Sequence, residues 1–137
     1  MNDPLRTAFL DKHNALRSAL ALGTVSNGQT GVLCRRASKM PTLTYNCELE
    51  KTAYERANLC EQMTSTASDG VSENSLNFTT RLDRTLEDAA ESAAQLWWSE
   101  LSMLEEGLEQ IQNLYYTHLG INSFAKVRSL VTYFEID

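Results

Sequence analysis

Three stretches of the chain place apolar residues at the three- and four-residue spacing of an amphipathic α-helix. The first predicts a helix over about 4–22. Asp3 offers an N-cap side chain before Pro4, and Gly23 is a natural stop. The face that this helix buries is predicted to carry His13 together with the apolar residues Leu5, Phe9, Leu16 and Leu20.

The second predicted helix covers about 46–63 and begins at the capping residue Asn46. Its buried face should hold Leu49, Ala53, Ala57 and Cys60. The third begins after Thr85, with Asp88 placed as the acid of a capping box, and Gly107 ends it. The buried stripe of this third helix is predicted to hold Glu100 among Leu86, Ala90, Ala93, Trp97 and Leu104.

The rest of the chain carries weaker signals. Residues 24–39 and 64–84 are polar and lack a period, so they predict long loops, the second with a short extended piece near 75–78. Residues 108–115 have helical spacing that Gly120 interrupts soon afterwards, and they predict only a weak fourth helix. Residues 129–135 are rich in β-branched and aromatic residues, which predicts a strand.

Composition and charge restrict the class of protein. With 137 residues, 42% of them hydrophobic, the chain fits one ordinary globular domain. The 18 acidic and 12 basic residues give a net charge of −6, which disfavours a phosphate backbone, and no basic stripe is visible that would offset it. We therefore expect no nucleic acid partner. No apolar run approaches the roughly 20 residues that cross a bilayer.

The cysteines leave the compartment open. The chain has an odd number of cysteines, Cys34, Cys47 and Cys60, and no two of them form a zinc-type CxxC pair. Cys47 and Cys60 lie roughly 20 Å apart along one predicted helix, so they cannot pair with each other, and Cys34 could reach only one of them. No leader peptide is visible, which fits a cytosolic protein or a mature secreted one. Asn77 begins a glycosylation acceptor triplet.

Few residues could carry chemistry. Neither a phosphate loop nor a hydrolase motif is present, and the chain has two histidines. We interpret His13 as a buried histidine that donates one ring proton to a carbonyl group. Arg17, one turn later, should bind an acid or the carbonyl groups at a helix end.

Glu100 lies on an apolar stripe, so its carboxylate must be paired, coordinated, protonated or at the edge of the stripe. Trp97 and Trp98 cannot both face inward from one stripe, which predicts that one of them lines a ligand groove or lies on the surface. Glu73 and His118 lie outside the strong helices. They are residue types that bind Zn²⁺ if the fold brings them together.

Five segments occur in a familiar order. Residues 9–17 (FLDKHNALR) resemble the HNxxR first helix of the CAP superfamily, and 40–50 (MPTLTYNCELE) resemble the start of its second helix. The pair at 73–74 matches part of a GEN signature, 97–101 (WWSEL) match a WWxEL motif, and 117–126 follow the outline of a GHxxQxxWAK segment. The superfamily comprises cysteine-rich secretory proteins, antigen-five venom allergens and plant pathogenesis-related class-one proteins.

The chain resembles most the activation-associated secreted proteins of parasitic nematodes, including the hookworm neutrophil- and platelet-inhibitor type. The resemblance implies an α+β fold, a CAP-type α-β-α sandwich of three main helices and a small antiparallel sheet. It makes 1–137 a single CAP domain of an extracellular protein. It also implies a non-enzymatic binding protein that modulates host defence through a host cell-surface receptor such as an integrin, with a lipid or sterol carrier as the alternative. The family's structural motif on the first helix corresponds to His13, Asn14 and Arg17.

The family's cavity holds two glutamates and two histidines that can bind a divalent metal. Glu73, Glu100 and His118 match three of these positions, and the fourth, a histidine expected between Cys60 and Glu73, is absent. Zn²⁺ is therefore a candidate cofactor with an incomplete set of ligands, and a metal-dependent hydrolase is the least favoured function. The family's closing cysteine-bearing strands have no counterpart, so we expect a domain that is truncated or degenerate at its C-terminal end, with an exposed sheet edge.

Overall fold

In the computed structural model of the chain, the described residues are 1–58, 71–109, 111, 115–128 and the backbone of 132–136. Along the chain, these residues form the α-helices, short 3₁₀-helices and strands α1 (Asp3–Ala21), α2 (Cys47–Ala57), β1 (Ser72–Leu76), α3 (Leu86–Ser99), η1 (Glu100–Met103), η2 (Thr117–Leu119), α4 (Asn122–Arg128) and β2 (Thr132–Ile136).

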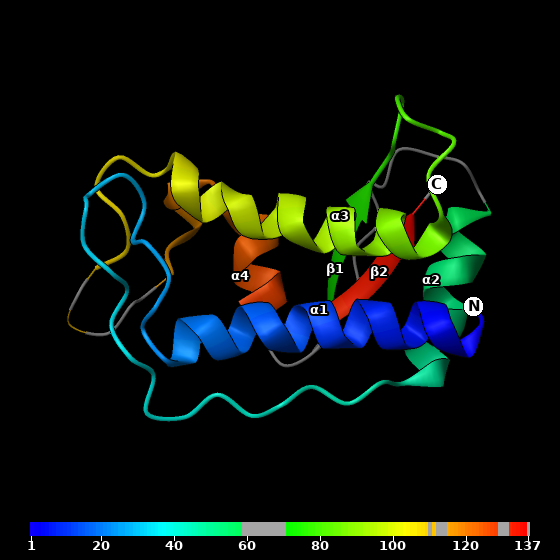
Figure 1. The fold of residues 1–137 in the computed structure, drawn as a ribbon, viewed down its shortest axis with the longest axis horizontal. Helices are drawn as coiled ribbons and strands as arrows, with labels where there is room; N and C mark the ends of the chain where they lie inside the picture. Colours follow the sequence, from blue (N-terminus) through cyan, green and yellow to red (C-terminus); the bar gives the residue numbers. More distant parts are fainter. Residues whose placement is uncertain (59–70, 110, 112–114, 129–131, 137) are drawn as a thin grey trace.

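The helices enclose a small sheet. α1 and α3 lie side by side and run in the same direction, and α4 packs against α3 (Figure 1). α2 packs against β2 and α4 packs against β1, and the strands lie between these two helices (Figure 1). This arrangement confirms the predicted α-β-α sandwich. No helix in the described part of the chain has the length and apolar character needed to cross a membrane.

The two strands pair in parallel, with Ser72 opposite Thr132 and Leu76 opposite Ile136. The prediction of an antiparallel sheet is therefore wrong for the strands described. Adjacent antiparallel strands can be joined by a tight turn, but parallel strands need a long crossover. Here the crossover contains α3 and α4, which lie between β1 and β2 in the chain.

The helix ends follow local capping chemistry. Asn46 accepts hydrogen bonds from the first turn of α2, and Thr85 accepts one from Asp88 N at 3.1 Å, as predicted. α1 begins one residue earlier than expected, because Asn2 Oδ1 accepts from Leu5 N at 2.9 Å. The third helix is shorter than predicted: α3 ends at Ser99, and the chain continues as η1.

The end of the chain differs more from the prediction. The weak helix expected at 108–115 is not seen in its described residues, and the remainder of that stretch lies outside them. Instead, α4 forms after Gly120, which adopts a left-handed conformation with φ 71°. Phe124 and Val127, three residues apart on α4, are buried, which is the helical spacing that could have indicated this element.

The loop after α1 is fixed by Asn27, which is 1% exposed. Asn27 Nδ2 donates to Leu108 O at 2.8 Å, and Leu108 N donates to Asn27 Oδ1 at 2.7 Å. Gly28 adopts a positive φ of 60°, and a Cβ at this position would lie 2.2 Å from Leu104 O. These contacts fasten the segment 24–34 to the segment after η1.

The core forms where α1, α3 and α4 meet. It buries Leu5, Phe9, Leu20, Cys34, Ala90, Ala93, Trp97, Trp98, Leu101, Leu108, Ile121, Phe124 and Val127. Leu86, predicted to lie on the buried stripe of the third helix, is instead 62% exposed at the first turn of α3. The small alanine side chains of α3 let α1 and α4 approach it closely. These two helices therefore cover two adjacent faces of α3.

Candidate functional site

Arg17 connects three parts of the chain from inside the protein. Its side chain is 3% exposed, and its guanidinium donates to Pro41 O at 2.8 Å, to Val127 O at 3.3 Å and to Arg128 O. The last two are carbonyl groups at the C-terminal end of α4. Of the two partners predicted for Arg17, the structure therefore shows helix-end carbonyls. The guanidinium charge is favourable there because the helix dipole is negative at that end.

The residues before Arg17 complete this motif. His13 is 1% exposed, its Nδ1 lies 2.8 Å from Phe9 O, and its ring stacks on the ring of Phe9. Burial lowers the pKa of His13 to about 4, so its ring is neutral near pH 7. Asn14 binds both backbone groups of Leu43: its Nδ2 donates to the carbonyl, and its Oδ1 accepts from the N–H at 2.8 Å. The motif on α1 thus fastens the segment before α2.

Glu100 is half-buried at the junction of α3 and η1. Its Oε2 accepts a hydrogen bond from Phe124 N at 2.9 Å, in the first turn of α4. A carboxylate at this position satisfies a backbone N–H that a helix leaves without an internal partner, and it is stabilised by the positive end of the helix dipole. Glu100 therefore caps α4, which explains how an acid is accommodated at the edge of an apolar stripe.

The other predicted metal ligands also have neighbours of their own. Glu73 Oε2 lies 3.5 Å from Arg56 Nε, which joins β1 to α2. His118 is exposed on η2, where its ring stacks on Tyr116. Among the described residues, no group of three or more His, Cys, Asp or Glu side chains is placed to hold a metal ion. The structure therefore does not bring the three predicted ligands together, and these residues do not fit a shared Zn²⁺ here.

Both tryptophans of α3 face the interior. Trp97 is 3% exposed, packs near Phe9, and donates from Nε1 to Ser75 O at 3.3 Å; Trp98 is 6% exposed and packs against Phe124. The prediction that one of them lines a groove or lies on the surface is wrong. It assumed that α3 buries a single stripe, whereas α1 covers the Trp97 face and α4 covers the Trp98 face.

The two described cysteines, Cys34 and Cys47, are free thiols. Cys34 is buried with a free thiol 3.6 Å from Asn27 Oδ1, and burial raises the pKa of this thiol. Cys47 is exposed at the start of α2 and is also free. Cys60 lies outside the described residues. Asn77 is exposed directly after β1, and its glycosylation stays a prediction.

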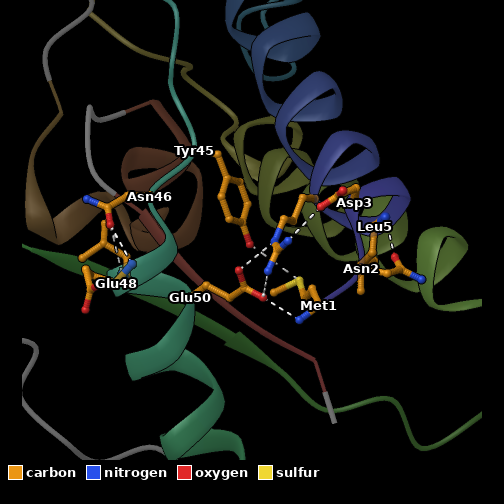
Figure 2. A network of polar contacts seen from close by, with 10 residues as sticks. Met1, Asn2, Asp3, Leu5, Tyr45, Asn46, Glu48 and Glu50 are labelled. Atoms are coloured by element: carbon orange, nitrogen blue, oxygen red, sulfur yellow. Dashed lines mark hydrogen bonds and ion pairs between the residues drawn. The ribbon is translucent and has the colours of Figure 1, made fainter.

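A polar cluster, which the sequence did not reveal, joins α1 to α2 around Glu50 (Figure 2). Arg6 donates to Glu50 from Nε at 2.9 Å and to Asp3 at 2.8 Å, and the N-terminal ammonium of Met1 lies 2.5 Å from Glu50. The hydrogen bond from Arg6 holds the pKa of Glu50 below its ordinary value, while burial and the nearby carboxylate raise the pKa of Tyr45 to about 12. The cluster fixes one carboxylate as an anion at this helix junction.

Beside this cluster lies a pocket of about 530 Å³, here called the α1–α2 pocket. Its lining comes from the N-terminal residue, α1, α2 and the first residue of α3, and it is mainly apolar. Arg6, Glu50 and Lys51 are its charged lining residues. The lining residues are Met1, Leu5, Arg6, Phe9, Cys47, Glu50, Lys51, Ala53, Tyr54, Ala57 and Leu86. This volume lies within the range of pockets that hold small organic ligands.

Comparison with known proteins gives consistent matches. The model of the CAP, or cysteine-rich secretory protein, family matches residues 10–125. Among curated proteins, "Ancylostoma secreted protein" of Ancylostoma caninum is 37% identical over 103 residues, which are 74% of this chain and 24% of that protein. "Hookworm platelet inhibitor 1" of the same organism is 31% identical over 101 residues, covering 74% of this chain and 41% of that protein.

Two solved structures have the same fold. The crystal structure of NaASP2 with Zn²⁺ matches with a TM-score of 0.72 and 29% identity, over 96% of this chain and 70% of that one. The crystal structure of Na-ASP-1 matches with a TM-score of 0.73 and 27% identity, over 98% of this chain and 34% of that one. The chain thus spans less than half the length of the curated relatives.

The contacts of Glu100 generate a test that separates a helix cap from a metal ligand. Glu100→Ala should lower the free energy of unfolding by about 1–2 kcal/mol, because it leaves the N–H of Phe124 without its acceptor. Glu100→Gln keeps an acceptor oxygen and should lose less than half of that amount. Urea denaturation measures both variants.

Zn²⁺ titration by calorimetry on the same proteins completes the test. The parent and Glu100→Ala should take up Zn²⁺ alike. A tenfold weaker uptake by Glu100→Ala, with unchanged stability, would show that Glu100 is a metal ligand and not a cap.

Proposed function

The chain belongs to the CAP family of cysteine-rich secretory proteins, and from this premise we propose that it is a secreted, non-enzymatic binding protein that engages a host cell-surface receptor of the integrin type. The observation that carries the proposal is its 31% identity to a protein named as a platelet inhibitor. Relatives named as secreted proteins support the extracellular location. Such a protein would modulate host defence by occupying the receptor.

Apolar side chains exposed on the loop after α1 and on the neighbouring segment from the end of η1 to Ile111 offer a surface for the receptor. Val32 and Leu33 are 51% and 55% exposed, and Met103 and Ile111 are 69% and 72% exposed. The bonds between Asn27 and Leu108 hold the two segments together at one end of the molecule, away from the N-terminus (Figure 1). We call these four exposed residues the end-loop surface. Exposed apolar side chains on fixed loops are typical of protein interaction sites.

The surroundings of the acidic residues support the non-enzymatic part of the proposal. Glu100 caps α4 and Glu73 pairs with Arg56, so both carboxylates already have structural roles. His13 is buried with its Nδ1 at a backbone carbonyl. General acid–base chemistry needs such groups within reach of a substrate, and these contacts direct them to the protein itself.

Surface plasmon resonance on a panel of immobilised leukocyte integrins and platelet receptors tests this function. The parent should bind at least one receptor. The double variant Val32→Asp/Leu33→Asp should bind at least tenfold more weakly, which corresponds to about 1.4 kcal/mol, because it places charge in the apolar contact. The matched control, Leu82→Asp/Leu96→Asp, alters two exposed leucines elsewhere and should bind within twofold of the parent. Absence of binding to the whole panel by folded protein would contradict the proposal.

The α1–α2 pocket favours a second candidate function, the carriage of a lipid or sterol. The pocket combines a mainly apolar lining with the charged residues Arg6, Glu50 and Lys51. This combination suits an amphiphile that places its hydrocarbon part against the apolar lining and its polar group beside the charged residues. The candidate is independent of the end-loop surface, since the two share no residue.

Native mass spectrometry after delipidation and reloading with a fatty acid or a sterol tests the carrier. The parent should recover one ligand per chain. Ala57→Trp should reduce the recovery at least fivefold, because the indole would fill the pocket that Ala57 lines. Ala15→Trp, a matched change at an exposed position of α1, should leave the recovery unchanged. Equal recovery by the two variants would remove this pocket from consideration.

A further inference from the structure

A second pocket, of about 420 Å³, lies where the C-terminal part of α1, the loop after it and the end of α4 meet. Four of its lining residues are cationic: Arg35, Arg36, Lys39 and Arg128. None of the nine described residues that line it is acidic. Leu20, Met40 and Ile111 add apolar surface. We call it the basic pocket.

The basic pocket stands out against the charge of the whole protein. The chain carries 18 acidic and 12 basic residues, yet four of the basic ones line this one pocket. The carboxylate of Glu109 is close by, since its Oε1 accepts from Ile111 N at 2.6 Å, but Glu109 is not a lining residue. Burial lowers the pKa of Arg128, so its charge is partly removed from water. An anion that entered the pocket would meet several cations with reduced screening.

The segment that carries three of these cations is held by backbone and side-chain contacts. Ala37 N donates to Ala21 O at 3.1 Å, and the Arg35 guanidinium donates to Ile111 O. The stem of Arg36 lies against Gly23, because a Cβ on Gly23 would be 2.8 Å from Arg36 Cγ. A ligand therefore finds these cations on a segment that is already placed, which reduces the entropy lost on binding.

We propose that the basic pocket binds a sulfated oligosaccharide. Arginine guanidinium groups bind oxyanions through paired, charge-assisted hydrogen bonds, and sulfate groups along a saccharide would supply several such anions at once. A narrow chain can enter the pocket and meet mainly its cations. An anionic membrane would instead face a broad part of a protein whose net charge is −6. This proposal does not depend on the receptor proposed above, although the basic pocket and the end-loop surface share Ile111.

Calorimetry with a heparin-derived hexasaccharide in 50 mM NaCl tests the proposal. The full chain should bind the hexasaccharide, and Arg36→Glu/Lys39→Glu should bind it at least tenfold more weakly. Lys12→Glu/Arg81→Glu makes the same change in net charge at positions outside the pocket and should stay within twofold of the parent. Circular dichroism and urea denaturation establish that each variant is folded. Because no receptor is present, this result is independent of the receptor panel.

The remaining outcomes would overturn the proposal. One is the absence of hexasaccharide binding by the folded parent. Another is an equal loss in the two double variants, which would show a response to net charge and not to the pocket. Two parallel arms use inorganic sulfate alone and phosphatidylcholine vesicles containing phosphatidylserine. If the vesicles bind through Arg36 and Lys39 and the hexasaccharide does not, the pocket recognises a membrane surface instead.

Discussion

A buried guanidinium holds the sandwich together. Arg17 lies inside the protein, and its charge is balanced by backbone carbonyl groups from the segment before α2 and from the end of α4. Burying a charge is costly unless its donors are satisfied, so the surrounding backbone must adopt one arrangement. Asn14 fastens the same segment one turn earlier on α1. Two side chains of α1 therefore hold the segment before α2 and the end of α4 against this helix.

This arrangement uses polar residues for structure and leaves the surface for binding. Glu100 accepts from a backbone N–H in the first turn of α4, and Arg17 donates to carbonyl groups at its C-terminal end. Both ends of this short helix are therefore bound by charged side chains of other elements. With these groups engaged, the end-loop surface, the α1–α2 pocket and the basic pocket stay open to partners in the described part of the chain. Each has a different chemistry, which allows their roles to be tested separately.

Local patterns predicted much of this fold, and non-local contacts explain the rest. The spacing of Leu5, Phe9 and His13 predicted the buried face of α1, and the side chain of Thr85 predicted the start of α3. The burial of both tryptophans was missed because a single helix does not reveal that two neighbours cover it. The basic pocket was missed for a similar reason: Lys39 and Arg128 are far apart in the chain and meet only in the fold.

The free energy of unfolding of Arg17→Met in urea, compared with that of Lys12→Met, tests this account most directly. Both variants remove one cation from α1, but only Arg17 is buried among backbone carbonyl groups. Arg17→Met should lose about 3 kcal/mol, because it leaves those carbonyls without a donor, while Lys12→Met should change stability by less than about 0.5 kcal/mol. Equal, small changes in the two variants would contradict the claim that Arg17 organises the fold.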